Sequence, residues 1–227
     1  GLGDVYKRQN QLDAGDCLRH INGSLYGNDY EERLFNVAME LCITWMNRIL
    51  FLKLLEAQML KYHNGDAIYK FLSITKIHDY DDLNTLFFQV LARDMGSRTH
   101  SIMRDFAYVP YLNSSLFEVT DLESKTIKIN SLSQRTVLPV LASSVLRNKK
   151  RNLQVNALPT LQYLFAFLDA YNFASEGSEE VQEEAKTLIN ASVLGLIFEK
   201  INGHKDGSVF TPGFITCLLY TSDAADD

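Results

Sequence analysis

A short segment near the carboxyl end of the sequence, GSVFTP from Gly207 to Pro212, combines residue types that could hold a small polar ligand. Gly207 permits a tight turn, and Pro212 fixes the exit of the short extended stretch between them. Phe210 would supply an apolar wall, and the Thr211 hydroxyl can both donate and accept a hydrogen bond. An isolated Phe-Thr-Pro tripeptide is also typical of an ordinary turn beside a core aromatic residue. From these residues alone, a ligand-binding segment and an ordinary turn both remain open.

A Glu-x-Lys arrangement at Glu123 and Lys125 has the spacing of one half of a restriction nuclease site. In such sites the carboxylate holds a metal ion and the lysine supports the attacking water. The same spacing recurs at Glu184 and Lys186 on an expected helix, and the sequence contains no Pro-Asp partner. A solvated strand edge is therefore the simpler interpretation, and no metal ligand is assigned.

The basic residues of the chain cluster once, at positions 147–151. The cluster contains Arg147, Lys149, Lys150 and Arg151. Such a run is typical of a solvated loop, and contact with DNA phosphates is the alternative. The chain carries 22 Lys and Arg against 28 Asp and Glu, a net charge of -6, which disfavours strong nucleic-acid binding by the chain alone.

Both ends of the sequence resemble translated sequencing adapters. Back-translation of residues 1–9, GLGDVYKRQ, and of residues 217–227, CLLYTSDAADD, gives codons that match transposon ends and read adapters. Such segments are excluded from reasoning about the fold. We expect residues 10–216 to be the natural part of the chain, an open reading frame interrupted at both ends. We also expect the two end segments to pack against little of it.

The composition is that of a globular protein, with 46% hydrophobic and 11% aromatic residues, enough to fill a core. Two cysteines of the natural part, Cys17 and Cys42, form no CxxC motif, so neither a disulfide framework nor a zinc site is expected. The most apolar run, from Ile49 to Leu60, is interrupted by Lys53 and Glu56 and is too short to span a bilayer. We expect a cytoplasmic protein with no membrane partner.

The longest periodic pattern predicts one buried helix from Asp29 to about Tyr62, because apolar residues recur there at steps of three and four. Asp29 stands where an N-cap residue is expected, and turn-forming residues after Tyr62 end the helix. The inward face should contain Leu41, Trp45, Leu52 and Leu55, and the outward face Glu31, Lys53 and Glu56.

Three shorter helices are predicted by the same periodicity. The first begins at Asp81 and Asp82, and its buried face contains Leu83, Leu86, Phe87, Val90 and Leu91. The second buries Leu161, Leu164, Phe165 and Leu168. The third begins after Ser178 and ends before residue 202, with acidic residues in its first turn.

Between Tyr108 and Arg151 the pattern changes to short extended or turn segments, with a strand expected where residues alternate from Thr126 to Ile129. The fold class is therefore mostly α with a minor extended or β segment. We predict a helical connector region at 10–107, an extended or loop platform at 108–158 and a second helical region at 159–216.

Three segments together resemble a known family. The last of them, from Leu194 to Thr216, resembles the segment ahead of the Gly-rich loop in N-6 adenine-specific DNA methyltransferases. The stretch VPYLNSSLFE, from Val109 to Glu118, is similar to the pylNGGLFe stretch of large fused restriction-modification enzymes. The helix RILFLKLLEAQML, from Arg48 to Leu60, resembles the helical connector of the type IIG fusions.

This resemblance implies that the complete parent transfers methyl from S-adenosylmethionine to the adenine exocyclic amine of double-stranded DNA. Gly207, Phe210, Thr211 and Pro212 would contact that cofactor. No Gly-x-Gly and no adjacent prolines occur between residues 10 and 216, so the cofactor loop and the Pro-Pro loop that holds the flipped base are both absent. We expect the chain to end at the entrance of an α/β methyltransferase domain and to be inactive alone. A non-catalytic helical scaffold or partner-binding domain is the alternative.

Overall fold

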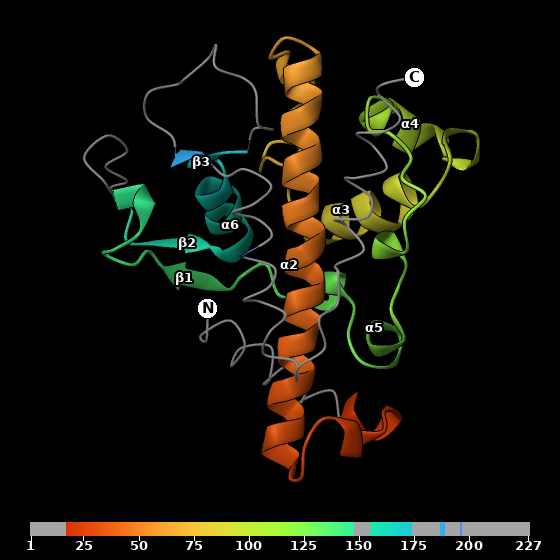
Figure 1. The fold of residues 1–227 in the computed structure, drawn as a ribbon, viewed down its shortest axis with the longest axis vertical. Helices are drawn as coiled ribbons and strands as arrows, with labels where there is room; N and C mark the ends of the chain where they lie inside the picture. The colour runs from red at the N-terminus through yellow and green to blue at the C-terminus, as the bar shows by residue number, and fades with distance from the viewer. Residues whose placement is uncertain (1–16, 148–154, 174–186, 189–195, 197–227) are drawn as a thin grey trace.

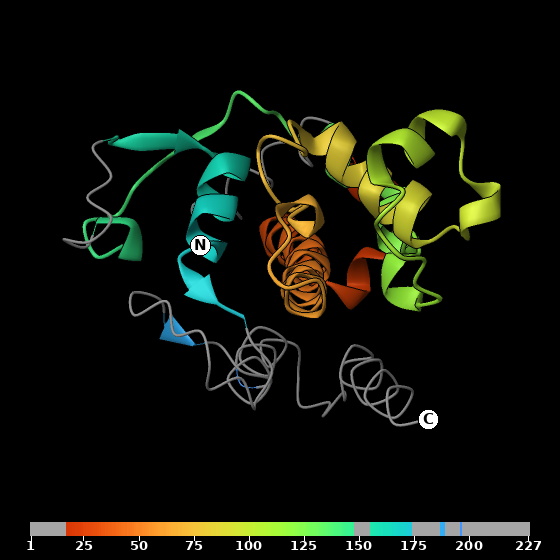
Figure 2. The same ribbon diagram turned by 90° about the horizontal axis from the view of Figure 1, so that it is seen from above.

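A single long helix, α2 (Tyr30–Tyr62), organises the fold (Figure 1). The computed structural model describes residues 17–147, 155–173, 187–188 and 196, and this part of the chain is mostly helical with little β structure, as predicted. At 1.5 Å per residue, α2 is about 50 Å long. Seen along its axis in Figure 2, α2 lies between α6 on one side and α3 with α4 on the other.

Local chemistry sets both ends of α2, as the sequence predicts. The Asp29 carboxylate accepts a hydrogen bond from the backbone N–H of Glu32, which caps the first turn. At the other end Asn64 and Gly65 have positive φ angles of 54° and 80°. This left-handed turn lets the Gly65 N–H bond back to the Leu60 carbonyl at 2.6 Å and stops the helix.

Short helices cover one side of α2. They are α3 (Tyr80–Thr85), which continues into a π-helical turn at Leu86–Leu91, then α4 (His100–Phe106) and α5 (Asp121–Lys125). The N-cap of α3 is Asp79, two residues before the predicted start. All five residues predicted on its buried face are buried. Short 3-10 turns connect the elements, at Cys17–His20, Gly23–Leu25, Ala67–Tyr69, Met95–Ser97, Ser115–Phe117, Ile129–Ser131 and Val145–Arg147.

The other side of α2 faces α6 (Thr160–Leu168) and short strands (Figure 1). Strands β1 (Val137–Pro139) and β2 (Ala157–Pro159) are antiparallel, with Leu138 opposite Leu158. Strands β3 (Tyr171–Asn172) and β4 (Thr187–Leu188) are parallel. The predicted helix at α6 is confirmed, since Leu161, Phe165 and Leu168 are buried and Leu164 is half-buried.

The main core gathers apolar side chains from α2, from α3, α4 and α5 on one side of it and from α6 on the other. Residues of all three predicted regions contribute to it. A smaller cluster lies beside β1 and β2 and contains Val140, Leu146, Leu158 and Ala170. Within the described part of the chain, none of the helices is long and apolar enough to cross a membrane.

The predicted inward face of α2 is confirmed for Leu41, Trp45 and Leu52, while Leu55 is half-buried. Glu31 is exposed, as predicted. The prediction that Lys53 and Glu56 face solvent is wrong, because both are buried. Every residue of α2 from 48 to 54 is buried, so this part of the helix has no solvent face on which to leave a charge.

The predicted strand from Thr126 to Ile129 is also wrong. The chain there runs from the end of α5 directly into the 3-10 turn at Ile129–Ser131. Thr126 is bonded through its hydroxyl and its N–H to the Leu122 carbonyl, which belongs to α5 and not to a strand partner. Of the predicted helix that begins after Ser178, the structure describes residues 187–188 and 196, and the prediction is wrong at Thr187 and Leu188, because they form strand β4 beside β3. The other residues of that helix lie outside the described residues, as do both end segments.

Candidate functional site

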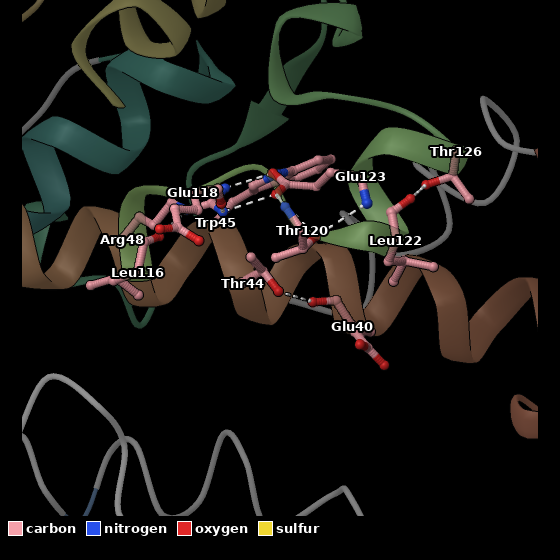
Figure 3. Close-up of polar contacts among 10 residues, drawn as sticks. All are labelled: Glu40, Thr44, Trp45, Arg48, Leu116, Glu118, Thr120, Leu122, Glu123 and Thr126. Carbon is pink, nitrogen blue, oxygen red and sulfur yellow. Dashed lines mark hydrogen bonds and ion pairs between the residues drawn. The ribbon is translucent and has the colours of Figure 1, made fainter. Parts of the chain in front are cut away.

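The most densely bonded polar site of the described chain centres on Arg48, in the middle of α2 (Figure 3). Its guanidinium group donates two hydrogen bonds to the Glu123 carboxylate, at 2.6 and 2.9 Å. It donates two more, both at 2.7 Å, to the backbone carbonyls of Leu116 and Glu118. Both charged side chains are fully buried, at 0% exposure. We call this group the Arg48 clamp.

Glu123 belongs to α5, and local sequence places its carboxylate at the clamp. Thr120 caps α5 through its hydroxyl, and the Glu123 side chain accepts a bond in return from the Thr120 N–H at 2.9 Å. This reciprocal pair is a capping box. The Trp45 indole N–H donates to the same carboxylate at 2.7 Å. The two Glu123 oxygens therefore accept five hydrogen bonds between them.

The electrostatics of the clamp favour the ionised state of Glu123. Burial by itself would raise the pKa of this carboxyl, but the hydrogen bonds and charge of Arg48 outweigh burial and hold the pKa below its usual value. The Arg48 guanidinium also lies over the rings of Phe87 and Phe88, at 5.6 and 5.1 Å from their centres. These contacts add a cation–π attraction to the ion pair.

This arrangement suits a structural role and not an acid or base role. A general base needs a free lone pair within reach of a substrate proton, and the Glu123 oxygens are occupied and closed to solvent. The interpretation of Glu123 as part of a solvated strand edge is wrong, because it is a buried residue of a helix. Among the described residues no group of three or more His, Cys, Asp or Glu side chains could hold a metal ion.

A second buried ion network joins α2 to the end of α6. Lys53 donates to Glu56 and to Asp169, both at 2.6 Å. Glu56 also accepts a bond from the Leu72 N–H, and the half-exposed Lys70 pairs with Asp169 at 2.8 Å. Burial alone would raise the pKa of Asp169, but Lys53 and Lys70 outweigh it and lower that pKa. This network explains how Lys53 and Glu56 can be buried together.

Both lowered carboxyl pKa values predict a loss of stability in acid. Glu123 and Asp169 bind protons more weakly in the folded chain than in the unfolded chain. Their contribution is therefore fully present above their unfolded pKa values, about 4, and is lost as the pH falls through the lower folded values. Urea unfolding between neutral and acid pH should show the free energy of unfolding falling steeply below about pH 4.

The matched variant for this measurement carries Glu123→Gln together with Asp169→Asn. It should be less stable at neutral pH, and its free energy of unfolding should fall less steeply in acid, because neither changed group can bind a proton there. A variant that kept the full acid slope would show that other groups cause it.

The cofactor residues predicted from the sequence, Gly207, Phe210, Thr211 and Pro212, lie outside the described residues, and their role stays a prediction. The same holds for the basic residues at 149–151. Of the basic cluster, Arg147 is described, and its guanidinium group donates hydrogen bonds to the backbone carbonyls of Val140 and Val155. These bonds direct the side chain toward the β1 and β2 segments.

Sequence reasoning missed the Arg48 clamp, although two signals for it were present. Arg48 lies three residues after Trp45 and four before Leu52, on the predicted inward face of the helix. A charge at the centre of such a face implies a buried partner of opposite charge. The Thr-x-x-Glu pattern at Thr120 and Glu123 is the second signal, because it marks a capping box and hence a helix start.

Comparison with known proteins identifies the family of the chain. Residues 5–189 match the family described as a domain of unknown function, DUF7814. No curated protein and no solved structure matches the chain. The match covers most of the sequence, including α2 and the Arg48 clamp. The chain therefore belongs to the DUF7814 family.

Proposed function

We propose that this chain is the helical connector of a type IIG-like restriction-modification enzyme. The complete parent would transfer methyl from S-adenosylmethionine to the adenine exocyclic amine of double-stranded DNA, in the cytoplasm. One observation carries the proposal. The resembling segments Arg48–Leu60 and Val109–Glu118 are distant in sequence, yet Arg48 of the first donates hydrogen bonds to the Leu116 and Glu118 carbonyls of the second.

The role proposed for the connector is mechanical. A helix of about 50 Å that is buried through its middle can hold two ends of an enzyme at a fixed separation. The Arg48 clamp fixes the 109–118 stretch to that helix, so this stretch cannot move independently of it. Chemistry would belong to the parent's Gly-rich and Pro-Pro loops, neither of which the sequence contains between residues 10 and 216.

A non-catalytic helical scaffold is the second candidate, and the closed character of the Arg48 clamp favours it equally. A methyl-transfer assay separates the two candidates. The natural protein that contains residues 10–216 would be incubated with tritiated S-adenosylmethionine and double-stranded DNA. We expect label on the adenine amine, and none when the 227-residue chain replaces the parent. A parent that neither binds the cofactor nor labels DNA would leave the scaffold as the function.

Thr211→Ala in that parent tests the proposed cofactor segment. The substitution removes a hydroxyl that would bond the amino-acid end of S-adenosylmethionine, a hydrogen bond worth about 0.5–1.5 kcal/mol. Cofactor affinity measured by calorimetry should fall about two- to tenfold, while the melting temperature and DNA binding stay close to those of the unaltered parent. Ser208→Ala, in the same segment but not assigned to the cofactor, is the matched control. Unchanged affinity in both Thr211→Ala and Phe210→Ala would remove this segment from the site.

A further inference from the structure

The antiparallel ribbon of β1 and β2 has apolar residues on both of its faces. On the inner face, Leu158 belongs to the smaller core cluster, against which Tyr163 and Ala166 of α6 pack. The alternate residues of each strand form the other face, because successive side chains point to opposite sides. That face carries the cross-strand pairs Val137 with Pro159, Pro139 with Ala157 and, one step further in the same register, Leu141 with Val155. We call these residues the outer ribbon face.

The outer ribbon face is apolar throughout and is open to solvent. All of its residues are exposed, and the exposed fractions of Val137, Leu141 and Val155 are 52, 61 and 48%. An antiparallel sheet with one face on the core normally turns polar side chains to water on the other face. Apolar residues on both faces are typical of a sheet that lies between two layers. Here α6 is one layer, and within the described part of the chain no second layer covers the outer face.

Two prolines direct a partner to this face and away from the edges of the ribbon. Residues that bond across an antiparallel pair alternate with residues whose backbone groups point outward. The Val140 N–H bonds across the ribbon to the Asn156 carbonyl, so Pro139 of β1 and Pro159 of β2 occupy outward positions. Proline has no N–H, and each edge therefore lacks a donor that an added strand would need. We expect a partner to cover the face and not to extend the sheet.

The charge around the ribbon is positive in an otherwise acidic chain. The sequence contains six Lys or Arg residues and no Asp or Glu between Thr126 and Leu168, whereas the whole chain has a net charge of -6. Arg135 lies two residues before β1, at one end of the ribbon. At the other end, Arg147 donates to the carbonyls of Val140 and Val155. These acceptors are uncharged and do not neutralise its guanidinium group.

We propose that the outer ribbon face binds an amphipathic helix of another polypeptide, with an apolar stripe against the face and acidic side chains beside the stripe. The stripe supplies the second layer, and the acidic side chains complement Arg135 and Arg147 at the two ends. Nucleic acid fits less well, because the face offers no hydrogen-bonding side chain and nucleic-acid interfaces are polar. From Val137 to Leu141 the face is about 14 Å long, which matches about nine residues of helix. The inference does not depend on the proposed methyl transfer.

Fluorescence anisotropy with labelled synthetic peptides tests the proposal on the 227-residue chain. The probe is a helical peptide of about eighteen residues, with leucine at steps of three and four and with glutamate and alanine elsewhere. A counterpart carries lysine in place of glutamate. The glutamate peptide should bind, and the lysine peptide should bind at least about tenfold more weakly, because its charge has the same sign as that of the ribbon.

Leu141→Glu tests whether the outer ribbon face is the binding surface. It should weaken binding of the glutamate peptide by about ten- to 150-fold, because the face loses an apolar contact and gains a like charge. The melting temperature should not change, since the Leu141 side chain is exposed. Leu25→Glu is the matched control, the same change at a leucine that is 77% exposed in another part of the chain, and it should bind as the unaltered chain does.

Two further measurements distinguish the occupant. Arg135→Gln should weaken binding about two- to fivefold at low salt, and the difference should disappear at about 1 M salt, where exposed charges are screened. The proposal is overturned if the glutamate peptide does not bind, if Leu141→Glu binds it normally, or if the lysine peptide binds equally well. It is also overturned if the chain self-associates or binds duplex DNA and Leu141→Glu abolishes that association, because a second copy or nucleic acid would then be the occupant. The assay contains no S-adenosylmethionine, so its failure leaves the methyl-transfer result standing.

Discussion

Replacing Arg48 by methionine should lower the free energy of unfolding by about 3–5 kcal/mol, one of the two largest effects expected in this chain. The substitution keeps an unbranched apolar chain in place of the arginine stem but leaves the Glu123 carboxylate buried without a counter-charge. It also removes the donor from the Leu116 and Glu118 carbonyls. Urea unfolding followed by circular dichroism measures the loss.

Lys125→Met is the matched control for Arg48→Met. Lys125 also forms an ion pair, with Asp121 at 2.7 Å, but both side chains are largely exposed. Exposed pairs of this kind contribute little, so the control should change the free energy of unfolding by less than about 1 kcal/mol. If Arg48→Met were no more destabilising than this control, the clamp would have no role in holding α5 against α2.

A double variant separates the ion pair from its surroundings. Arg48→Met combined with Glu123→Leu removes both charges at once, so no uncompensated charge is left in the core. It should be more stable than the sum of the two single variants predicts, by an amount that measures the coupling between the two side chains. Additive losses would mean that Arg48 acts mainly through the carbonyls of the 109–118 stretch.

The limits of α2 could be predicted from the sequence because they depend on adjacent residues. Asp29 caps the helix through the N–H three residues on, and the Asn64-Gly65 turn closes it by bonding to Leu60. Both effects require only residues within one or two turns of each other. The same is true of α6 and of the buried face of α3, whose apolar spacing is visible in a short window.

The charged core could not be predicted in the same way, because its partners are far apart in sequence. Arg48 and Glu123 are separated by 75 residues, and Lys53 and Asp169 by 116. A prediction from apolar periodicity places charged residues such as Lys53 on the solvent side of a helix. That prediction fails where other elements surround the helix on all sides. The position of Arg48 on the inward face indicates that it needs a buried partner. Which residue is that partner depends on how α5 packs against α2.

The prediction that Glu123 lies at a solvated strand edge was wrong for the same reason, because its partners are far away in the sequence. The alternation from Thr126 to Ile129 suggested a strand, and a strand would have left Glu123 at its edge. The capping box formed with Thr120 starts a helix instead, and the bonds from Arg48 and Trp45 hold that helix in the core. The cofactor segment at 207–212 lies outside the described residues and stays a prediction from the resemblance.

Trp45→Ala should lower the free energy of unfolding by about 3–5 kcal/mol, because the ring is only 2% exposed and its removal leaves a cavity beside the clamp. Trp45→Phe divides this loss into two parts. Phenylalanine keeps an aromatic ring in the core but cannot donate to Glu123, and a hydrogen bond to a charged group contributes about 1.5–3 kcal/mol. The phenylalanine variant should therefore lose about half as much stability as the alanine variant.

Circular dichroism must follow unfolding in both variants, since Trp45 is the one tryptophan of the chain and its fluorescence is lost. Tyr62→Ala, a change of an exposed ring on the same helix, is the control and should alter stability by less than about 0.5 kcal/mol. If Trp45→Phe matches the unaltered chain, the indole N–H adds nothing to the clamp and packing alone explains the alanine result. If Trp45→Ala also loses less than about 1 kcal/mol, the ring is not a core residue, and α2 does not bury the face that its sequence pattern predicts.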